Sequence, residues 1–230
     1  MNIYAVICTR SADKYTKTTE KLLRYYTEAG IKVVLLANQS SIFSAYNRAL
    51  EKIKPKPEDI VIFCHDDIVI RDSESEFVQM LQDELTDSSV GFVGPAGTTY
   101  LTRNAVWWNQ DIWRMGRHRG CVYHLNGQGR EYKTFYGDPG PVAVLDGLFL
   151  AAKGSTIEDI SFEKPEYFEG DWDFYDIHYT TQAHLKGYTN KVVKMNILHN
   201  SAGELAGRDS WHKNREAYIQ NTDLPLIIEM

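Results

Sequence analysis

The chain has 230 residues, of which 43% are hydrophobic, so it is long enough and apolar enough to bury a sizeable core. This composition excludes an intrinsically disordered chain. The 25 lysines and arginines are outnumbered by 31 aspartates and glutamates, and the formal charge of −6 argues against a protein with a broad basic surface for nucleic acid.

The three cysteines, Cys8, Cys64 and Cys121, are widely spaced and form no C-x-x-C pair, which argues against a disulfide framework or a zinc site. No run of about 18 apolar residues occurs, and the apolar start over 3–8 is too short for a secretory signal. We therefore expect a soluble, cytoplasmic protein with no transmembrane segment.

The first 65 residues alternate between buried-type apolar runs and amphipathic segments. Gly30 ends the first helix, and the second helix carries Ile42, Ala45 and Ala49 on one face before Pro55 stops it. The elements expected here are strands over 4–8, 31–37 and 60–64 and helices over 14–29 and 42–53. This β-α-β-α-β order with short connections predicts a parallel sheet with helices on its faces.

The later part of the chain is less regular. The segment 98–141 is rich in Trp, Gly, Arg and His and shows no clear period, so we expect a long functional excursion there instead of sheet scaffold. Around it the sequence predicts helices over 74–85 and 172–186 and strands over 90–94, 142–152 and 192–198. No internal repeat or linker divides the chain, which predicts one domain over 1–230.

Two carboxylates and an imidazole, His65-Asp66-Asp67, follow the buried strand directly. Acidic groups at the mouth of a buried strand lose hydration unless a positive charge meets them, and a divalent cation carrying a diphosphate would supply that charge. In open α/β sheets the ligand crevice lies outside the carboxyl ends of the strands, which is where these side chains would fall. Alone, the triplet could equally be a solvated turn.

Five short motifs, taken together, resemble those of GT-A fold glycosyltransferases of the family 2-like branch, in a bacterial and phage subgroup. They span nearly the whole chain in the family's order. The motifs are Phe63-Cys64-His65-Asp66-Asp67, Gly91-Phe92-Val93-Gly94, Leu145-Asp146-Gly147, Phe174-Tyr175-Asp176 and His199-Asn200-Ser201-Ala202-Gly203. The resemblance implies an α/β GT-A fold with a mostly parallel sheet flanked by helices. It also implies a metal-dependent, inverting enzyme that transfers a sugar from a nucleotide-sugar, with UDP as the expected nucleotide, to a hydroxyl acceptor.

The resemblance implies a site for Mn²⁺ or Mg²⁺ in which Asp67 is a direct ligand and His199 supplies a late ligand. Imidazole suits Mn²⁺ better than Mg²⁺. Asp66 would point to the opposite face of an extended backbone. His65 stands where most members have the aspartate that contacts the ribose. For His199 the alternative is a strand-end histidine bonded to backbone.

Asp176 aligns with the general base of inverting members. With a pKa of about 4, its carboxylate would be ionised at neutral pH and could accept the proton of the attacking hydroxyl. Asp171 and Asp173 compete for this role, although acids at a helix start are often only favourable with the helix dipole.

The remaining implied contacts concern the nucleotide-sugar donor. Asp146 and Gly147 would lie beside the donor sugar, with a bulge in a strand as the alternative. Arg48 could pair with phosphate or with a carboxylate, as could the arginine after the first strand. The residues implied to hold the nucleobase and ribose are Cys8, Thr9, Arg10, Asn38, Gln39 and Asn47.

By the same resemblance, residues 1–97 would bind the nucleotide, and 142–230 would bind the acceptor and close over the site. The segment 100–119 holds three tryptophans and four arginines, which suits stacking and charge pairing, or else is a flap packed on the domain. The tail over 204–220 could be a lid or a plain covering helix.

The expected acceptor is a glycan or lipid-linked sugar, with a hydroxylated DNA base as an alternative. A sugar- or nucleotide-binding module without catalysis is the non-enzyme alternative. A nucleotidyltransferase is disfavoured, because no glycine follows the first strand.

Overall fold

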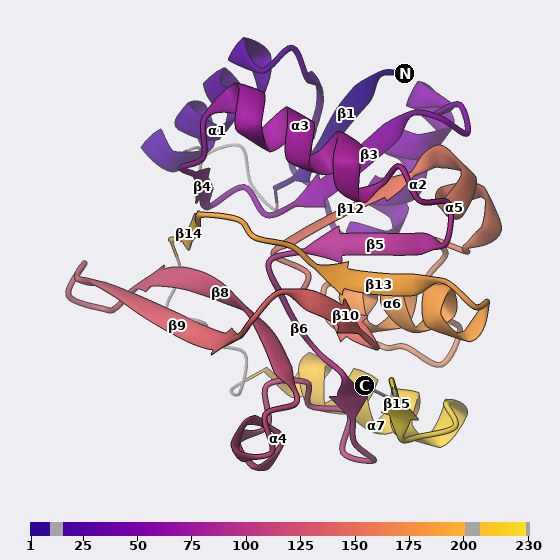
Figure 1. Cartoon of the computed structure of the whole chain (residues 1–230). Helices are drawn as coiled ribbons and strands as arrows, with labels where there is room; N and C mark the ends of the chain where they lie inside the picture. The colour runs from indigo at the N-terminus through magenta and orange to yellow at the C-terminus, as the bar shows by residue number, and fades with distance from the viewer. Residues whose placement is uncertain (10–15, 201–207, 229–230) are drawn as a thin grey trace.

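The computed structural model of the chain describes residues 1–9, 16–200 and 208–228 (Figure 1). The elements in chain order are β1 (Ile3–Cys8), α1 (Lys17–Glu28), β2 (Lys32–Leu36), α2 (Ile42–Ile53), β3 (Ile60–Cys64), β4 (Ile68–Ile70), α3 (Glu74–Glu84), β5 (Val90–Gly94), β6 (Ala96–Thr98), β7 (Tyr100–Leu101), α4 (Gln110–Arg114), β8 (His118–Leu125), β9 (Glu131–Gly137), β10 (Gly140–Val142), β11 (Val144–Leu145), β12 (Phe149–Lys153), α5 (Gly154–Asp159), α6 (Tyr175–Leu185), β13 (Thr189–Val192), β14 (Ile197–His199), α7 (Asp209–Asn221) and β15 (Leu226–Ile227).

The main sheet has seven strands in the order β10-β13-β5-β12-β3-β1-β2. Strands β1, β2 and β3 run parallel, with Ala5 opposite both Val33 and Ile62, as the β-α-β-α-β pattern predicts. Strand β12 enters antiparallel between β3 and β5, which makes the sheet mixed. Its antiparallel direction brings the start of β12 beside the carboxyl end of β3.

Helices cover both faces of the main sheet (Figure 1). On one face Tyr26 of α1 lies with its hydroxyl 3.3 Å from the sulfur of Cys64. On the other face Tyr46 of α2 packs on the ring of Phe63, with centroids 4.7 Å apart. Since successive residues of a strand point to opposite faces, His65 is directed toward the side occupied by α2 and α6.

A second sheet has the order β11-β6-β8-β14-β4, with β9 added beside β8. Within the described residues the chain passes between the main sheet and this second sheet at six short breaks: β3 to β4, β5 to β6, β9 to β10, β10 to β11, β11 to β12, and β13 to β14. The predicted single strands over 142–152 and 192–198 were therefore wrong. Each is divided because its parts hydrogen-bond in different sheets.

The prediction of an irregular excursion over 98–141 also needs correction. The segment contains α4 and a long antiparallel hairpin of β8 and β9. Burial alternates along the start of β8, but the inward positions include His118 and Gly120, so the alternation is not an apolar one. At Gly120 the φ angle is +104°, and an added Cβ would lie 2.0 Å from the carbonyl oxygen of Pro95. Only glycine fits this irregular point of the hairpin.

Over the described ranges no helix is both long and apolar enough to cross a membrane. Cys8, Cys64 and Cys121 are in no disulfide, and the first two are buried.

Candidate active site

Three side chains, two from the break between β3 and β4 and one from the end of β14, converge on one point. His65 and Asp67 lie on the turn from β3 to β4, and His199 ends β14, which pairs with β4. Asp67 Oδ1 lies 3.3 Å from His199 Nε2 and 3.9 Å from His65 Nδ1, and the two imidazole nitrogens are 3.4 Å apart. The backbone N–H of Asn200 donates to the carbonyl of Asp67 at 2.8 Å, which fixes the two segments together.

The spacing of these three atoms fits a small divalent cation. The point equidistant from them lies about 2.1 Å from each, which is the usual ligand distance for Mg²⁺ or Zn²⁺ and close to that for similar ions. Two imidazoles and one carboxylate favour a transition metal over Mg²⁺. We call His65, Asp67 and His199 the metal triad.

The charged forms of Asp67 and His199 stabilise each other. Burial alone would raise the pKa of Asp67, but the hydrogen bond from His199 and the two nearby imidazoles hold this pKa below its ordinary value. Burial would lower the pKa of His199, yet Asp67 raises it above the ordinary value. An ionised carboxylate therefore lies beside two imidazole nitrogens.

Gly147 connects the triad to Asp176. It lies on the break between β11 and β12, and its N–H donates to Asp176 Oδ2 at 2.9 Å while its carbonyl accepts the hydroxyl of Tyr175 at 2.9 Å. The same tyrosine oxygen lies 2.9 Å from His65 Nε2. An added Cβ at position 147 would lie 2.5 Å from the Tyr175 hydroxyl, so the close approach of α6 requires glycine.

Asp176 is not the ordinary carboxylate that the sequence analysis assumed. Burial, followed by the negative charge of Asp146, raises the pKa of Asp176 from 3.8 to about 7. Burial also raises the pKa of Asp146, whose Oδ1 accepts the Leu148 N–H at 2.8 Å and so holds the turn. A base with a pKa near the operating pH is well matched to general-base catalysis.

The two competing aspartates are engaged elsewhere. Asp171 pairs with Lys164 at 3.1 Å. Asp173 is buried, and its carboxylate accepts the Ser210 hydroxyl at 2.7 Å and lies 3.3 Å from Arg208. Of the three acids in this segment, Asp176 is the one that faces Gly147.

Phe174 starts α6 in an unusual backbone conformation, with a φ of +68° that a bulky side chain rarely adopts. Its ring is held between Trp211 and Tyr218, with centroids 5.4 and 5.6 Å away. Strained residues persist where the surroundings enforce them and often occur at functional sites. Here the strained residue directly precedes Tyr175 and Asp176.

The residues implied to hold the nucleobase lie at the ends of β1 and β2. Cys8 and Thr9 are buried, and Thr9 N–H donates to the carbonyl of Leu36 at 3.0 Å. Asn38 has a φ of +56°, and the Gln39 N–H donates to the carbonyl of Thr9 at 3.1 Å. These four residues therefore lie together at the carboxyl ends of β1 and β2.

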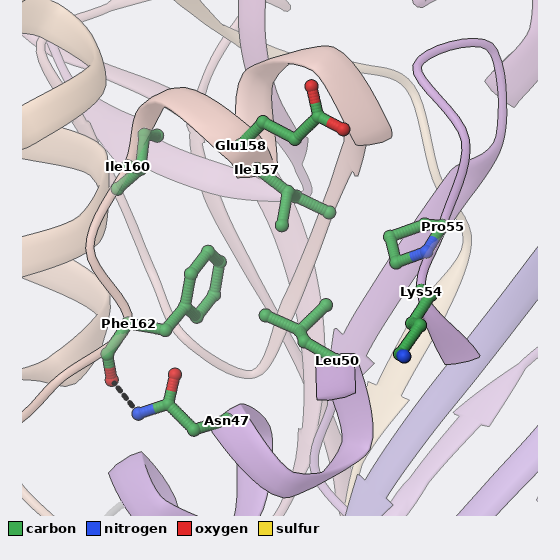
Figure 2. Close-up of a pocket in the computed structure, with 8 residues that line it drawn as sticks. All are labelled: Asn47, Leu50, Lys54, Pro55, Ile157, Glu158, Ile160 and Phe162. Carbon is green, nitrogen blue, oxygen red and sulfur yellow. Dashed lines mark hydrogen bonds between the residues drawn. The ribbon is translucent and has the colours of Figure 1, made fainter. Parts of the chain in front are cut away.

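Other implied donor contacts lie elsewhere or outside the described residues. Asn47 donates to the carbonyl of Phe162 at 3.0 Å and lines a separate hollow between α2 and α5, shown in Figure 2. The carbonyl of Asp66 accepts the Thr19 hydroxyl at 3.0 Å. Arg48 donates hydrogen bonds to the side chain of Gln39 and to the carbonyl of Ser44. Arg10 falls outside the described residues, as do 201–203 of the last motif.

Two of the tryptophans in the excursion pack within the protein. Trp107 is buried against Tyr136, with ring centroids 5.4 Å apart, and Trp108 packs on Trp211 of α7 at 5.6 Å. Trp113 also contacts Tyr136, with ring centroids 5.2 Å apart, but its side chain is 41% exposed.

Helix α7 is docked firmly through Asn214, which hydrogen-bonds the N–H and carbonyl of Gly170 and the carbonyl of Asp173. The described part of the tail is thus a covering helix.

Sequence reasoning placed His65 at the ribose and gave Tyr175 no role. The signal for Tyr175 was its position in the Phe174-Tyr175-Asp176 motif.

Comparison with known proteins identifies the family and the fold. Residues 4–221 match the model of the glycosyltransferase-like family. The streptomycin biosynthesis protein StrF of Streptomyces griseus is 27% identical over 167 residues, which are 71% of this chain and 55% of that protein. The chain thus spans about half the length of this relative.

Among solved structures, TarS of S. aureus has a TM-score of 0.51 at 15% identity, over 97% of this chain and 40% of TarS. GalNAc-T7 with UDP, GalNAc and Mn²⁺ has a TM-score of 0.51 at 10% identity, over 87% of this chain and 44% of that one. A197 from STIV has a TM-score of 0.50 at 14% identity, over 87% and 86% of the two chains. At these identities the likeness shows the fold alone.

The family match covers nearly the whole chain, and the solved structures share its mixed α/β architecture. The chain therefore belongs to the glycosyltransferase-like family of enzymes and has the GT-A fold that its motifs predict.

Proposed function

We propose that the protein transfers a sugar from a nucleotide-sugar, a UDP-sugar in the first instance, to a hydroxyl acceptor with inversion at the anomeric carbon. The observation that carries the proposal is the metal triad joined through Gly147 and Tyr175 to a half-buried carboxylate, Asp176. A metal site and a base of raised pKa, held next to each other, suit the departure of a diphosphate and the activation of a hydroxyl.

In this proposal His65, Asp67 and His199 hold a divalent cation, and their nitrogen-rich donor set favours Mn²⁺ over Mg²⁺. When bound, such an ion would neutralise the diphosphate as it leaves. The solved structure of GalNAc-T7 contains UDP, GalNAc and Mn²⁺, which supports the choice of ligands to be tested.

The donor would extend from the triad along the edge formed by the ends of β1 and β2. Thr9 and Gln39 would face the nucleoside, and the Asp146-Gly147 turn would lie beside the sugar. This places nucleotide binding in residues 1–97 and places the base and acceptor side in residues 142–230. The role assigned to Asn47 in nucleotide binding is weakened by its hydrogen bond to Phe162.

Asp176 would accept the proton of the acceptor hydroxyl as that oxygen attacks the anomeric carbon. The bond from the anomeric carbon to the diphosphate oxygen breaks in the same displacement. The hydrogen bond from Gly147 N–H to Asp176 Oδ2 would help to orient the carboxylate for this role. The proposed acceptor is a sugar hydroxyl of a glycan or lipid-linked sugar, which the partly exposed Trp113 could help to stack.

The test is UDP release from a panel of UDP-sugars, with and without sugar acceptors, in the presence of Mn²⁺. Asp176→Asn should keep UDP binding and lose roughly 10²-fold or more in transfer rate. Asp171→Asn is the matched control, since it removes a carboxylate from the same segment. Near-normal turnover by Asp176→Asn would remove Asp176 as the base. Salt-sensitive binding of hydroxymethylated duplex DNA would instead favour the DNA acceptor.

A further inference from the structure

The ring of His65 has its two nitrogens in different surroundings. Nδ1 faces the triad, at 3.4 Å from His199 Nε2 and 3.9 Å from Asp67 Oδ1. Nε2 faces away from the triad and lies 2.9 Å from the hydroxyl of Tyr175. A histidine can serve as a metal ligand only through a nitrogen that carries no proton, so the position of the ring proton decides whether His65 can complete the site.

The hydroxyl group of Tyr175 determines which nitrogen of His65 carries the ring proton. A phenol has one hydrogen to donate, and the carbonyl oxygen of Gly147, also 2.9 Å from the hydroxyl, can only accept. The phenol hydrogen therefore goes to Gly147, and the phenol oxygen must accept its second hydrogen bond from His65. In the neutral imidazole, Nε2 therefore carries the ring proton and Nδ1 carries the lone pair.

We propose that Tyr175 is a positioning residue that fixes His65 in the Nε2–H tautomer and so presents Nδ1 as the third protein ligand of the triad. The inference rests on the proposed function, because it assigns a role within the same metal site. Outer hydrogen bonds of this kind orient ligating imidazoles and commonly affect metal affinity by about 10- to 100-fold.

The surroundings of Tyr175 hold its hydroxyl in place. The residue is 5% exposed, and its ring lies edge-on to Tyr46 at 5.9 Å and to Tyr179 at 6.1 Å. Gly147 uses its carbonyl for Tyr175 and its N–H for Asp176, so one glycine positions both a ligand's partner and the proposed base. Displacing this turn would disturb the metal site and the base together.

The first test is Tyr175→Phe, which removes the hydroxyl and keeps the ring. Titration of the chain with Mn²⁺ alone, followed by the electron paramagnetic resonance signal of free Mn²⁺, should show affinity falling about 10- to 100-fold. Tyr179→Phe is the matched control: it lies one turn further along α6, is fully buried, and donates to the Phe162 carbonyl at 3.2 Å. Its affinity for Mn²⁺ should equal that of the wild type.

The second test asks whether Tyr175 acts through His65. In a His65→Ala chain, Tyr175→Phe should cause no further loss of Mn²⁺ affinity, because the two changes remove one shared interaction. An equal loss in both backgrounds would show that Tyr175 acts by another route and would overturn the proposal.

The third test reads the tautomer directly. Long-range ¹H–¹⁵N correlation spectra of the metal-free chain should show His65 protonated at Nε2, and Tyr175→Phe should shift this population toward Nδ1–H. A wild-type His65 protonated at Nδ1, or an unchanged Mn²⁺ affinity in Tyr175→Phe, overturns the proposal. A wild type with the Nε2–H tautomer that binds no Mn²⁺ overturns the metal site of the proposed function and, with it, the ligand role of His65.

Discussion

Replacing Asp176 by Asn should stabilise the metal-free protein at alkaline pH, at the cost of the proposed activity. The pKa of Asp176 lies at about 7 in the folded protein instead of 3.8. The folded chain therefore keeps a proton that the unfolded chain releases between about pH 4 and pH 7, and the stability of the wild type falls as the pH rises through this window. Asn does not titrate, so the stability of the variant should not fall in this window for that reason.

The size of the effect follows from the pKa. Raising the pKa from 3.8 to about 7 means that, above pH 7, the ionised carboxylate lowers the free energy of unfolding by about 4 kcal/mol. Asp176 is half-buried, so water can relax around the charge, and we expect about half of this, about 2 kcal/mol, as the gain at pH 8. At pH 5 the folded carboxyl is mostly protonated, and the gain should fall below about 1 kcal/mol.

The assay is urea unfolding of wild type and Asp176→Asn at pH 5 and pH 8 with a chelator present. Comparing the two proteins at each pH cancels every other group that titrates. Asp171→Asn is the control, and its difference from wild type should be the same at both pH values, because Asp171 forms an ion pair near the surface. An Asp176→Asn difference that is independent of pH, or a variant less stable than wild type at pH 8, would refute the reasoning.

Three further outcomes are expected. Asp67→Asn should fold normally yet lose the Mn²⁺-dependent rise in melting temperature that UDP causes. The control is Asp111→Asn, which replaces a carboxylate on α4 that is 81% exposed and should keep this rise. Equal rises in the two variants would argue against Asp67 as a metal ligand. Gly147→Ala should lose about 1–3 kcal/mol in urea unfolding, since the new carbon would lie 2.8 Å from Asp176 Cβ. Gly127→Ala, with open space around it, should change little, and similar losses in both would contradict this. The transfer rate should rise with pH and level off above about 7, as Asp176 ionises; a flat profile from pH 5 to 8 would not fit.

The parts of the fold that the sequence predicted well are the short apolar strands and two of the helix starts. The strands β1, β3 and β5 lie within a residue of their predicted bounds, because most of their residues are buried in the sheet. The helices α2 and α3 begin at their predicted residues, after Ser41 and Ser73, which each accept a backbone N–H through the side chain. Helix α1 begins at Lys17 after the cap Thr16, three residues later than predicted.

The breaks between the sheets could not be predicted from local patterns. The run 142–152 is apolar except for Asp146-Gly147, and this pair alone does not show whether the run is bulged or passes from pairing with β6 to pairing with β3 and β5. The hairpin of β8 and β9 was missed because His118 and Gly120 occupy inward positions that are usually apolar, while much of β9 is exposed. These choices depend on tertiary contacts, which override local propensity.

For the candidate site, too, some features could be predicted from the sequence and others could not. Asp67, Asp176 and His199 could be proposed from motifs, since each follows an apolar segment at a position that the family resemblance marks. The third member of the triad could not, because the role of His65 depends on a tyrosine 110 positions away in the sequence. The raised pKa of Asp176 likewise depends on burial and on Asp146, neither of which is visible in the motif.

The most direct test of the account is thermal unfolding of the protein with UDP and a panel of UDP-sugars, each with Mn²⁺ and with a chelator. A ligand that binds only the folded chain stabilises it by about 2.7 kcal/mol at a hundredfold excess over its Kd. We expect UDP and one UDP-sugar to raise the melting temperature with Mn²⁺ present, and to do so neither with chelator nor in Asp67→Asn. The same shift with chelator, or no shift with any nucleotide, would contradict a metal-dependent nucleotide-sugar site.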